Sequence, residues 1–184
     1  MYLEILKIPA WDCLPYDRVS PNSGITSQRC FALTRIAELD VNNTCLILIT
    51  VNAFLQRLPP LSFFKGMSVN LKLNKSYPLS ELLLTLENGG YFRTDTVREA
   101  GEFAVRGGII DIYPAGRDEP LRLDFFGDEL ESVKRFDPIT QRSIDSIESA
   151  KLSPVAEIIL NSESIKRFKS SYREAFGAKA SNDQ

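Results

Sequence analysis

The residues best suited to chemistry lie around one short motif, an arginine followed by two glycines. Arg106 precedes Gly107 and Gly108 between two apolar, strand-like segments. A planar guanidinium can form bidentate hydrogen bonds to a carboxylate, so this arginine could anchor a protein partner. On the pattern alone we favour a simpler interpretation, a β-bulge in which one glycine takes positive φ and Arg106 is only solvated.

Several other chemistries are excluded by residue types that the sequence lacks. It contains no histidine, so serine triads, cysteine–histidine dyads and histidine-ligated metals are ruled out. It has no P-loop motif and no DExH-type box, so we do not expect the chain to hydrolyse a nucleotide. The acidic residues Asp128, Glu129 and Glu131 lack the spacing of a calcium loop and fit a solvated hairpin face. We predict no catalytic residue, no cofactor and no metal.

Cysteine usage and hydropathy predict the compartment. Cys13, Cys30 and Cys45 are odd in number and have no CxxC spacing. This argues against a disulfide framework and a zinc site, and it favours a reducing cytoplasm. No signal-peptide pattern opens the sequence, and no apolar run approaches the ~20 residues that cross a bilayer. We therefore expect a cytoplasmic protein with no membrane partner.

Charge is distributed unevenly along the chain, although the formal net charge is only -2. Residues 1–75 carry 8 Lys+Arg against 5 Asp+Glu, residues 76–150 carry 8 against 15, and residues 151–184 carry 6 against 4. The middle third is therefore acidic, which makes it a poor surface for tracking phosphates. It is a better candidate for binding a protein partner.

Hydrophobic patterns over residues 1–66 predict part of a layered α/β domain. A helical pattern begins at Ile25, with Thr26 or Ser27 as its N-cap. The run 45–51 is continuously apolar and of strand length, which is typical of a strand buried on both faces of a parallel sheet. A helix followed by such a strand indicates an incomplete parallel-sheet domain.

The patterns over residues 67–152 predict a smaller α+β domain with a mainly antiparallel sheet. Residues 67–75 alternate as a strand, and residues 81–87 form an apolar helix face that stops at a glycine pair. Between 102 and 136, short alternating segments and turn residues predict a β-meander. Residues 146–154 add a last strand.

The third predicted unit is the C-terminal segment, residues 153–184. It contains a basic helix that begins at Ser162. We expect this helix to pack back on the first domain and to end in a frayed tail.

Two long motifs resemble the domain shared by UvrB and the transcription-repair coupling factors. They are GEFAVRGGIIDIYP at 101–114 and LRLDFFGDELESVKRFDPITQRS at 121–143. Upstream, IPAWDCLPYDRVSPNSGITSQRCFALTRI and VNAFLQRL are more similar to the coupling factors than to UvrB. The resemblance covers roughly residues 8 to 156. It implies an α/β fold, with an incomplete helicase-like parallel-sheet domain over 1–66 that lacks the P-loop part.

The resemblance also implies a function and its residues. The shared domain binds the damage-recognition protein UvrA, and the matching contact positions here are Arg93, Arg106, Arg122, Asp124 and Phe126. UvrB has a further arginine where this chain has Ala104, so part of that contact is expected to differ.

The resemblance to the coupling factors also implies partners for the full-length protein. The resemblance implies that RNA polymerase, duplex DNA and ATP-dependent translocation belong to other parts of the full-length protein, and that this chain is not an enzyme. A DNA-binding fragment acting like UvrB is the alternative, and a truncated NTPase is a further rival. For DNA contact the chain offers Trp11, Tyr16 and Arg18, which we expect instead to pack within their loop.

Overall fold

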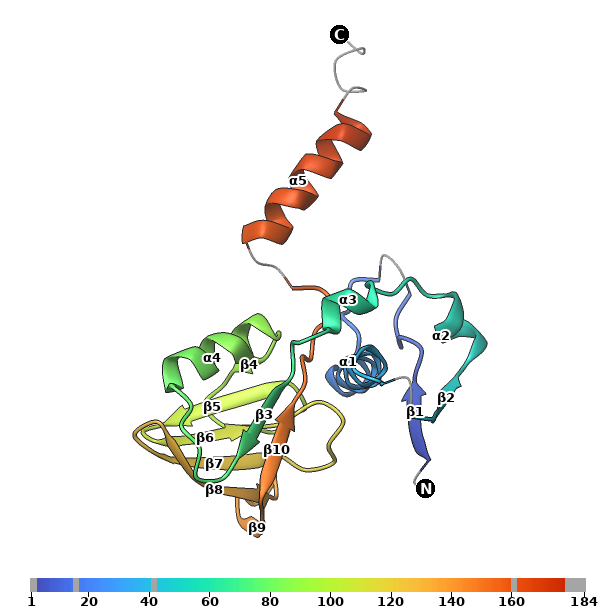
Figure 1. Ribbon diagram of the computed structural model, residues 1–184. Coiled ribbons are helices and arrows are strands. Elements are labelled where there is room, and N and C mark those ends of the chain that lie inside the picture. Colours follow the sequence, from blue (N-terminus) through green and yellow to red (C-terminus); the bar gives the residue numbers. More distant parts are fainter. Residues whose placement is uncertain (1–2, 15–16, 41–42, 160–161, 178–184) are drawn as a thin grey trace.

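The computed structural model describes residues 3–14, 17–40, 43–159 and 162–177. Figure 1 shows two packed parts and one helix that projects from them. The first part holds a parallel sheet and three helices, and the second holds two antiparallel or mixed sheets and one helix. The chain therefore has a mixed α/β structure in which antiparallel pairing predominates.

In the first part, β1 (Glu4–Ile8) and β2 (Cys45–Ile49) form a two-stranded parallel sheet. α1 (Ser23–Ala37) packs against β1, while the short helices α2 (Val51–Leu55) and α3 (Leu61–Phe64) follow β2. The buried apolar side chains of this core come from β1, α1 and α3: Leu6, Ile8, Cys30, Ala32, Leu33 and Phe64.

α1 begins two residues before the position that its apolar pattern predicted, because its N-cap is Asn22 and not Thr26 or Ser27. The Asn22 side chain accepts a hydrogen bond from the Gly24 amide at 2.9 Å. An asparagine carbonyl satisfies a free amide of the first turn as well as a serine or threonine hydroxyl does. Thr26 already lies inside the helix, with its amide bonded to the Asn22 carbonyl.

The prediction that β2 is buried on both faces is wrong. Leu46, Ile47 and Leu48 keep 44%, 42% and 45% of their surface exposed. Among the described residues, β2 pairs with β1 alone, so much of its apolar surface has no neighbour. A continuous apolar run therefore shows that a strand could be buried on both faces. It does not show that other residues of the same chain cover those faces.

The second part is built on a six-stranded sheet of order β4-β5-β6-β7-β8-β9. Only β4 and β5 are parallel, and every other neighbouring pair is antiparallel, which confirms the predicted meander. The strands are β4 (Phe92–Arg93), β5 (Glu102–Arg106), β6 (Ile109–Ile112), β7 (Leu121–Phe126), β8 (Glu129–Phe136) and β9 (Ser143–Ile147).

One face of this sheet, here named the inner face, carries the main core. It packs against α4 (Leu79–Asn88) and against a second sheet in which β3 (Val69–Lys72) pairs antiparallel with β10 (Ser149–Leu152). α4 contributes Leu82 and Leu86 to this core. The helix ends, as its glycine pair predicted, where Gly90 takes a φ of 87°.

Two details of the second part differ from the sequence prediction. The Arg-Gly-Gly motif is a two-residue hairpin turn and not a bulge, because Arg106 pairs with Ile109 and Gly107 takes a φ of 61°. The single strand expected over 146–154 is instead the end of β9 followed by β10, which belong to different sheets.

The two parts are joined by packing and by charge. Phe31 of α1 packs against both cores. It lies so close to Gly116, whose φ is +71°, that a Cβ atom there would come within 2.2 Å of the phenylalanine ring. At the other end of α1, Glu38 forms an ion pair with Lys151 of β10. These contacts fix the first part against the second.

α5 (Ser162–Phe176) lies outside both cores. None of its residues is buried, and Figure 1 shows it projecting away from the rest of the chain. The stretch 153–157 before it makes the contact with the first part that we expected of the helix, through Glu157 against Arg29. The tail beyond 177 lies outside the described residues. No described helix is long and apolar enough to cross a membrane.

Candidate protein-interaction site

Two rows of side chains cross the face of the six-stranded sheet that is turned away from the main core, here named the outer face. The first row, across β5, β6, β7 and β8, is Ala104, Asp111, Arg122 and Lys134. The second row, two positions along each strand, is Arg106, Ile109, Asp124 and Ser132. Side chains alternate between the faces of a sheet, so Phe126 follows Arg122 and Asp124 on the outer side of β7.

Asp111 is the most buried charged residue of the outer face, with 1% of its side chain exposed. It accepts two hydrogen bonds from Arg122, from Nε at 2.7 Å and from Nη2 at 3.0 Å. It accepts a third from Nη2 of Arg106 at 3.1 Å. A buried carboxylate needs charged partners of this kind, because an unpaired one would carry a large desolvation penalty.

Arg122 is held on three sides. Its guanidinium stacks on the ring of Phe136, with 4.9 Å from Cζ to the ring centroid, and its Nη1 reaches the carbonyl of Gln141 at 3.4 Å. The hydrogen bonds to Asp111 raise the pKa of Arg122 above its ordinary value. With 21% of its side chain exposed, this arginine is a fixed positive charge at the base of the outer face.

The more exposed residues surround this base. Arg106 is held by Asp111 through one nitrogen, and 53% of its side chain remains exposed. Asp124 is half-buried and Phe126 is 77% exposed, and neither has an ion-pair or aromatic partner among the described residues. The structure thus brings four of the five predicted contact residues together on one face: Arg106, Arg122, Asp124 and Phe126.

The fifth predicted residue, Arg93, lies at the edge of the sheet. It is exposed in β4, whose two residues pair with the start of β5. Arg93 and Arg106 both line a hollow with a volume of about 580 Å³. Because Arg93 lies opposite Phe103, whose side chain is part of the main core, it is an edge residue and not a member of the outer-face rows.

Asp111 is a residue of this candidate site that the sequence interpretation missed. Its signal was present, because a lone acid inside the apolar strand at 109–112 needs a cation as a partner. A two-residue hairpin turn would have set Ala104 opposite Asp111, and the arginine two residues further along beside it. Because the sequence interpretation treated the glycine pair as a bulge, it did not predict this pairing of β5 with β6.

Ala104 occupies the position where UvrB is expected to carry a second arginine. It is 1% exposed and packs with Val97 and Phe136 in a small core on the outer side of the sheet. Phe136 in turn supports the guanidinium of Arg122. At this position the chain therefore has an apolar support for one arginine in place of a further charge.

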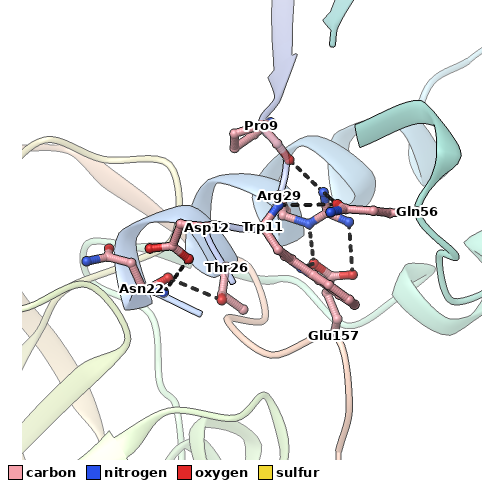
Figure 2. A network of polar contacts seen from close by, with 8 residues as sticks. All are labelled: Pro9, Trp11, Asp12, Asn22, Thr26, Arg29, Gln56 and Glu157. Carbon is pink, nitrogen blue, oxygen red and sulfur yellow. Dashed lines mark hydrogen bonds and ion pairs between the residues drawn. The ribbon is translucent and has the colours of Figure 1, made fainter. Parts of the chain in front are cut away.

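A second polar network lies between the two parts, around the fully buried Arg29 (Figure 2). Its guanidinium donates to Glu157 at 2.5 Å and 3.4 Å, to the Pro9 carbonyl at 2.6 Å and to Gln56 at 3.1 Å. The indole nitrogen of Trp11 also donates to Glu157, at 3.1 Å. The network joins segments that lie far apart in the sequence.

Trp11, one of the residues considered for DNA contact, takes part in this network. The Trp11 ring lies against Arg29, with 5.1 Å from Cζ to the ring centroid, as expected for loop packing. Arg18 is exposed, and Tyr16 lies outside the described residues.

The second part matches a known domain family over residues 69–157, the UvrB interaction domain. The chain as a whole is similar to transcription-repair-coupling factors, with alignments over 95% of its residues. It is 34% identical over 175 residues to that of Escherichia coli (strain K12), 35% over 174 residues to that of Haemophilus influenzae, and 38% over 175 residues to that of Rickettsia typhi. It spans 15% of the length of each of these relatives. The resemblance stated from the sequence motifs is thereby confirmed.

Proposed function

We propose that this chain is a non-catalytic module that recruits UvrA, and that it does so as part of a transcription-repair coupling factor. The carrying observation is the outer face, where buried Asp111 holds Arg106 and Arg122 while Asp124 and Phe126 remain available. The family that residues 69–157 match is an interaction domain, which supports a binding role.

The chemistry of the outer face specifies what the partner must present. Arg106 keeps donors that Asp111 does not use, so it suits a carboxylate on the partner. Asp124 suits a cation or an amide donor, and Phe126 suits an apolar depression. Because Asp111 fixes the arginines before binding, little side-chain entropy is lost when the partner arrives.

The wider role rests on the coupling factors to which the chain is similar. In that setting the module links a stalled RNA polymerase to nucleotide excision repair, while duplex DNA binding and ATP-dependent translocation are carried out by other parts of the protein. Residues 1–66 then form a fragment of a helicase-like domain, and the exposed apolar surface of β2 faces the rest of that domain.

Titration calorimetry of this chain with UvrA tests the proposal. Reversing the charge of a central interface arginine, with Arg106→Glu, is expected to cost at least ~2 kcal/mol, or about thirtyfold in affinity. Arg167→Glu is the matched control, because it makes the same charge change on exposed α5 and should leave the affinity unchanged.

The two results lead to different functions. Binding that is lost in the Arg106 variant and kept in the control supports recruitment and assigns its site to the outer face. If the folded wild-type chain does not bind UvrA, recruitment is refuted, and salt-dependent binding to duplex DNA would then favour the UvrB-like alternative.

A further inference from the structure

A second hollow, with a volume of about 340 Å³, lies at the junction of the two parts, between the start of α1 and the loop that follows β6. α1 contributes Gly24, Ser27 and Gln28 to its lining, and the loop contributes Gly116, Arg117 and Asp118. None of the five predicted UvrA-contact residues lines this hollow, so it is a separate candidate site.

We propose that this junction hollow binds the phosphate group of a small-molecule ligand, held by the first turn of α1, the Ser27 hydroxyl and the Arg117 guanidinium. Because its lining comes from both parts of the chain, the bound ligand also ties one part to the other. The inference goes beyond the proposed function and does not depend on UvrA binding.

The first supporting observation is the state of Ser27. Only 2% of this residue is exposed, and its hydroxyl oxygen has no hydrogen-bond partner among the described residues. A helical hydroxyl can bond to the carbonyl four residues back, as Thr34 does with Cys30 at 2.7 Å, but Ser27 makes no such bond. Buried polar atoms are nearly always paired, so this one indicates a missing partner in the hollow that it lines.

The second supporting observation is the positive charge around that hydroxyl. The first turn of α1 contains no acidic residue, so the positive end of the helix dipole is not neutralised there. Asn22 caps the Gly24 amide, whereas the amides of Ser23 and Ile25 have no acceptor in the described part of the chain. Arg117 is half-buried and forms no ion pair with any described residue.

The number of donors favours a phosphate group over a carboxylate. The Ser27 hydroxyl, the Gln28 side-chain amide and the helix amides lie on one wall, and the Arg117 guanidinium lies on the other. A carboxylate has two oxygens in one plane, whereas a phosphate group has three or four that point in different directions. A phosphate group can therefore accept from both walls at once.

Nearby acids restrict the ligand to a small one. Asp118 lines the hollow, and Glu99 accepts a hydrogen bond from the Ser23 hydroxyl at 3.0 Å. Residues 76–150 carry 8 Lys+Arg against 15 Asp+Glu, a net charge of -7. Such a surface repels a polyanion like DNA, whereas one phosphate group interacts mainly with the donors inside the hollow.

Titration of the isotopically labelled chain with inorganic phosphate at constant ionic strength, followed by amide NMR, tests the proposal. Shifts should saturate at residues 23–28 and 116–118, with half-saturation at about 1 mM for a ligand of so few atoms. At 10-fold that concentration, phosphate should raise the Tm by about 3–6 °C relative to chloride.

Three variants separate the site from a merely structural role. Ser27→Ala removes a buried hydroxyl that has no partner, so the unliganded chain should lose no stability while its affinity for phosphate falls about tenfold. Arg117→Met should also weaken binding about tenfold, with Arg167→Met on exposed α5 as its control. Asp118→Asn should tighten binding about threefold at low salt, whereas Asp40→Asn, the same change beyond the other end of α1, should not.

Four results would overturn the assignment. The first is the absence of a saturable shift with phosphate, and the second is unchanged affinity in both Ser27→Ala and Arg117→Met. The third is acetate binding as tightly as phosphate, which would make the hollow a carboxylate site. The fourth is a labelled duplex DNA that produces the same local shifts at lower concentration and with a steep salt dependence, which would replace the small ligand by a nucleic acid.

Discussion

Removal of the Glu157 carboxylate should strongly destabilise the chain, although Glu157 is not one of the outer-face residues. Arg29 is 0% exposed and donates hydrogen bonds to both oxygens of this carboxylate. In Glu157→Ala the guanidinium stays buried, and its remaining partners are two neutral acceptors, the Pro9 carbonyl and Gln56. A buried charge left without its counter-charge costs about 3–5 kcal/mol.

The loss should be visible in a thermal melt. For a chain of this length, 1 kcal/mol corresponds to a change in Tm of roughly 2–4 °C, so we expect a decrease of about 6–20 °C. Replacing both charges, with Arg29→Met and Glu157→Leu, removes the buried charge itself and should restore most of the stability. Glu163→Ala on exposed α5 is the control for losing an acid, and it should change the Tm little.

The assay has a reporter inside the network, because the chain contains a single tryptophan. Trp11 donates to Glu157 and stacks on Arg29, so its fluorescence follows this junction, while circular dichroism follows the whole chain. In urea, coincident transitions would show that the junction and the sheets unfold together. A loss below about 1 kcal/mol in Glu157→Ala would refute the reasoning that this pair is needed to cover a buried charge.

Two further predictions concern pH and packing. The hydrogen bond from Arg35 lowers the pKa of Glu4 below its ordinary value of 4.5. The stabilisation that this pair gives the fold is therefore complete above pH 4.5, and it is lost as the pH falls through the lowered pKa. The Tm of Arg35→Met should therefore fall less between pH 5 and about 3 than that of the wild type, and equal slopes would contradict this assignment. Gly116→Ala places a Cβ atom within 2.2 Å of the Phe31 ring and should cost about 1–3 kcal/mol in urea unfolding. Gly66 also has positive φ, but a Cβ atom there would meet no atom within 4 Å. A similar loss of stability in Gly66→Ala would therefore mean that the effect comes from the backbone conformation and not from the clash with Phe31.

Local patterns were sufficient to predict most elements of the second part. Residues 121–125 alternate between apolar and polar side chains, and residues 129–136 form a second strand-like segment after Gly127 and Asp128. A two-residue turn between two such segments leaves little choice but a hairpin, although the pairing itself contains a register shift between Asp124 and Phe125. The helix that ends at Asn88 with Gly89 as its C-cap was predictable for the same reason, since its apolar face lies directly before its stop signal.

Features that depend on distant residues were not predictable in this way. The partner of Arg29 is Glu157, 128 residues away, and no local pattern connects them. The exposure of β2 depends on which elements pack beside this strand and not on the composition of the strand itself. For the outer face, the predicted contact residues came from the family resemblance, whereas the position of Asp111 beside Arg106 required the register of β5 and β6.

The pairing of β3 with β10 has a consequence for how this domain is carried by its protein. Val69 lies opposite Leu152, so the chain enters and leaves the domain side by side. A unit whose two ends meet can be inserted into a loop of another fold without stretching either one, and it can be removed by joining the flanking segments with a short linker. We therefore expect that residues 69–152 can be inserted into an unrelated scaffold as a binding domain that keeps the six-stranded sheet and its charged outer face.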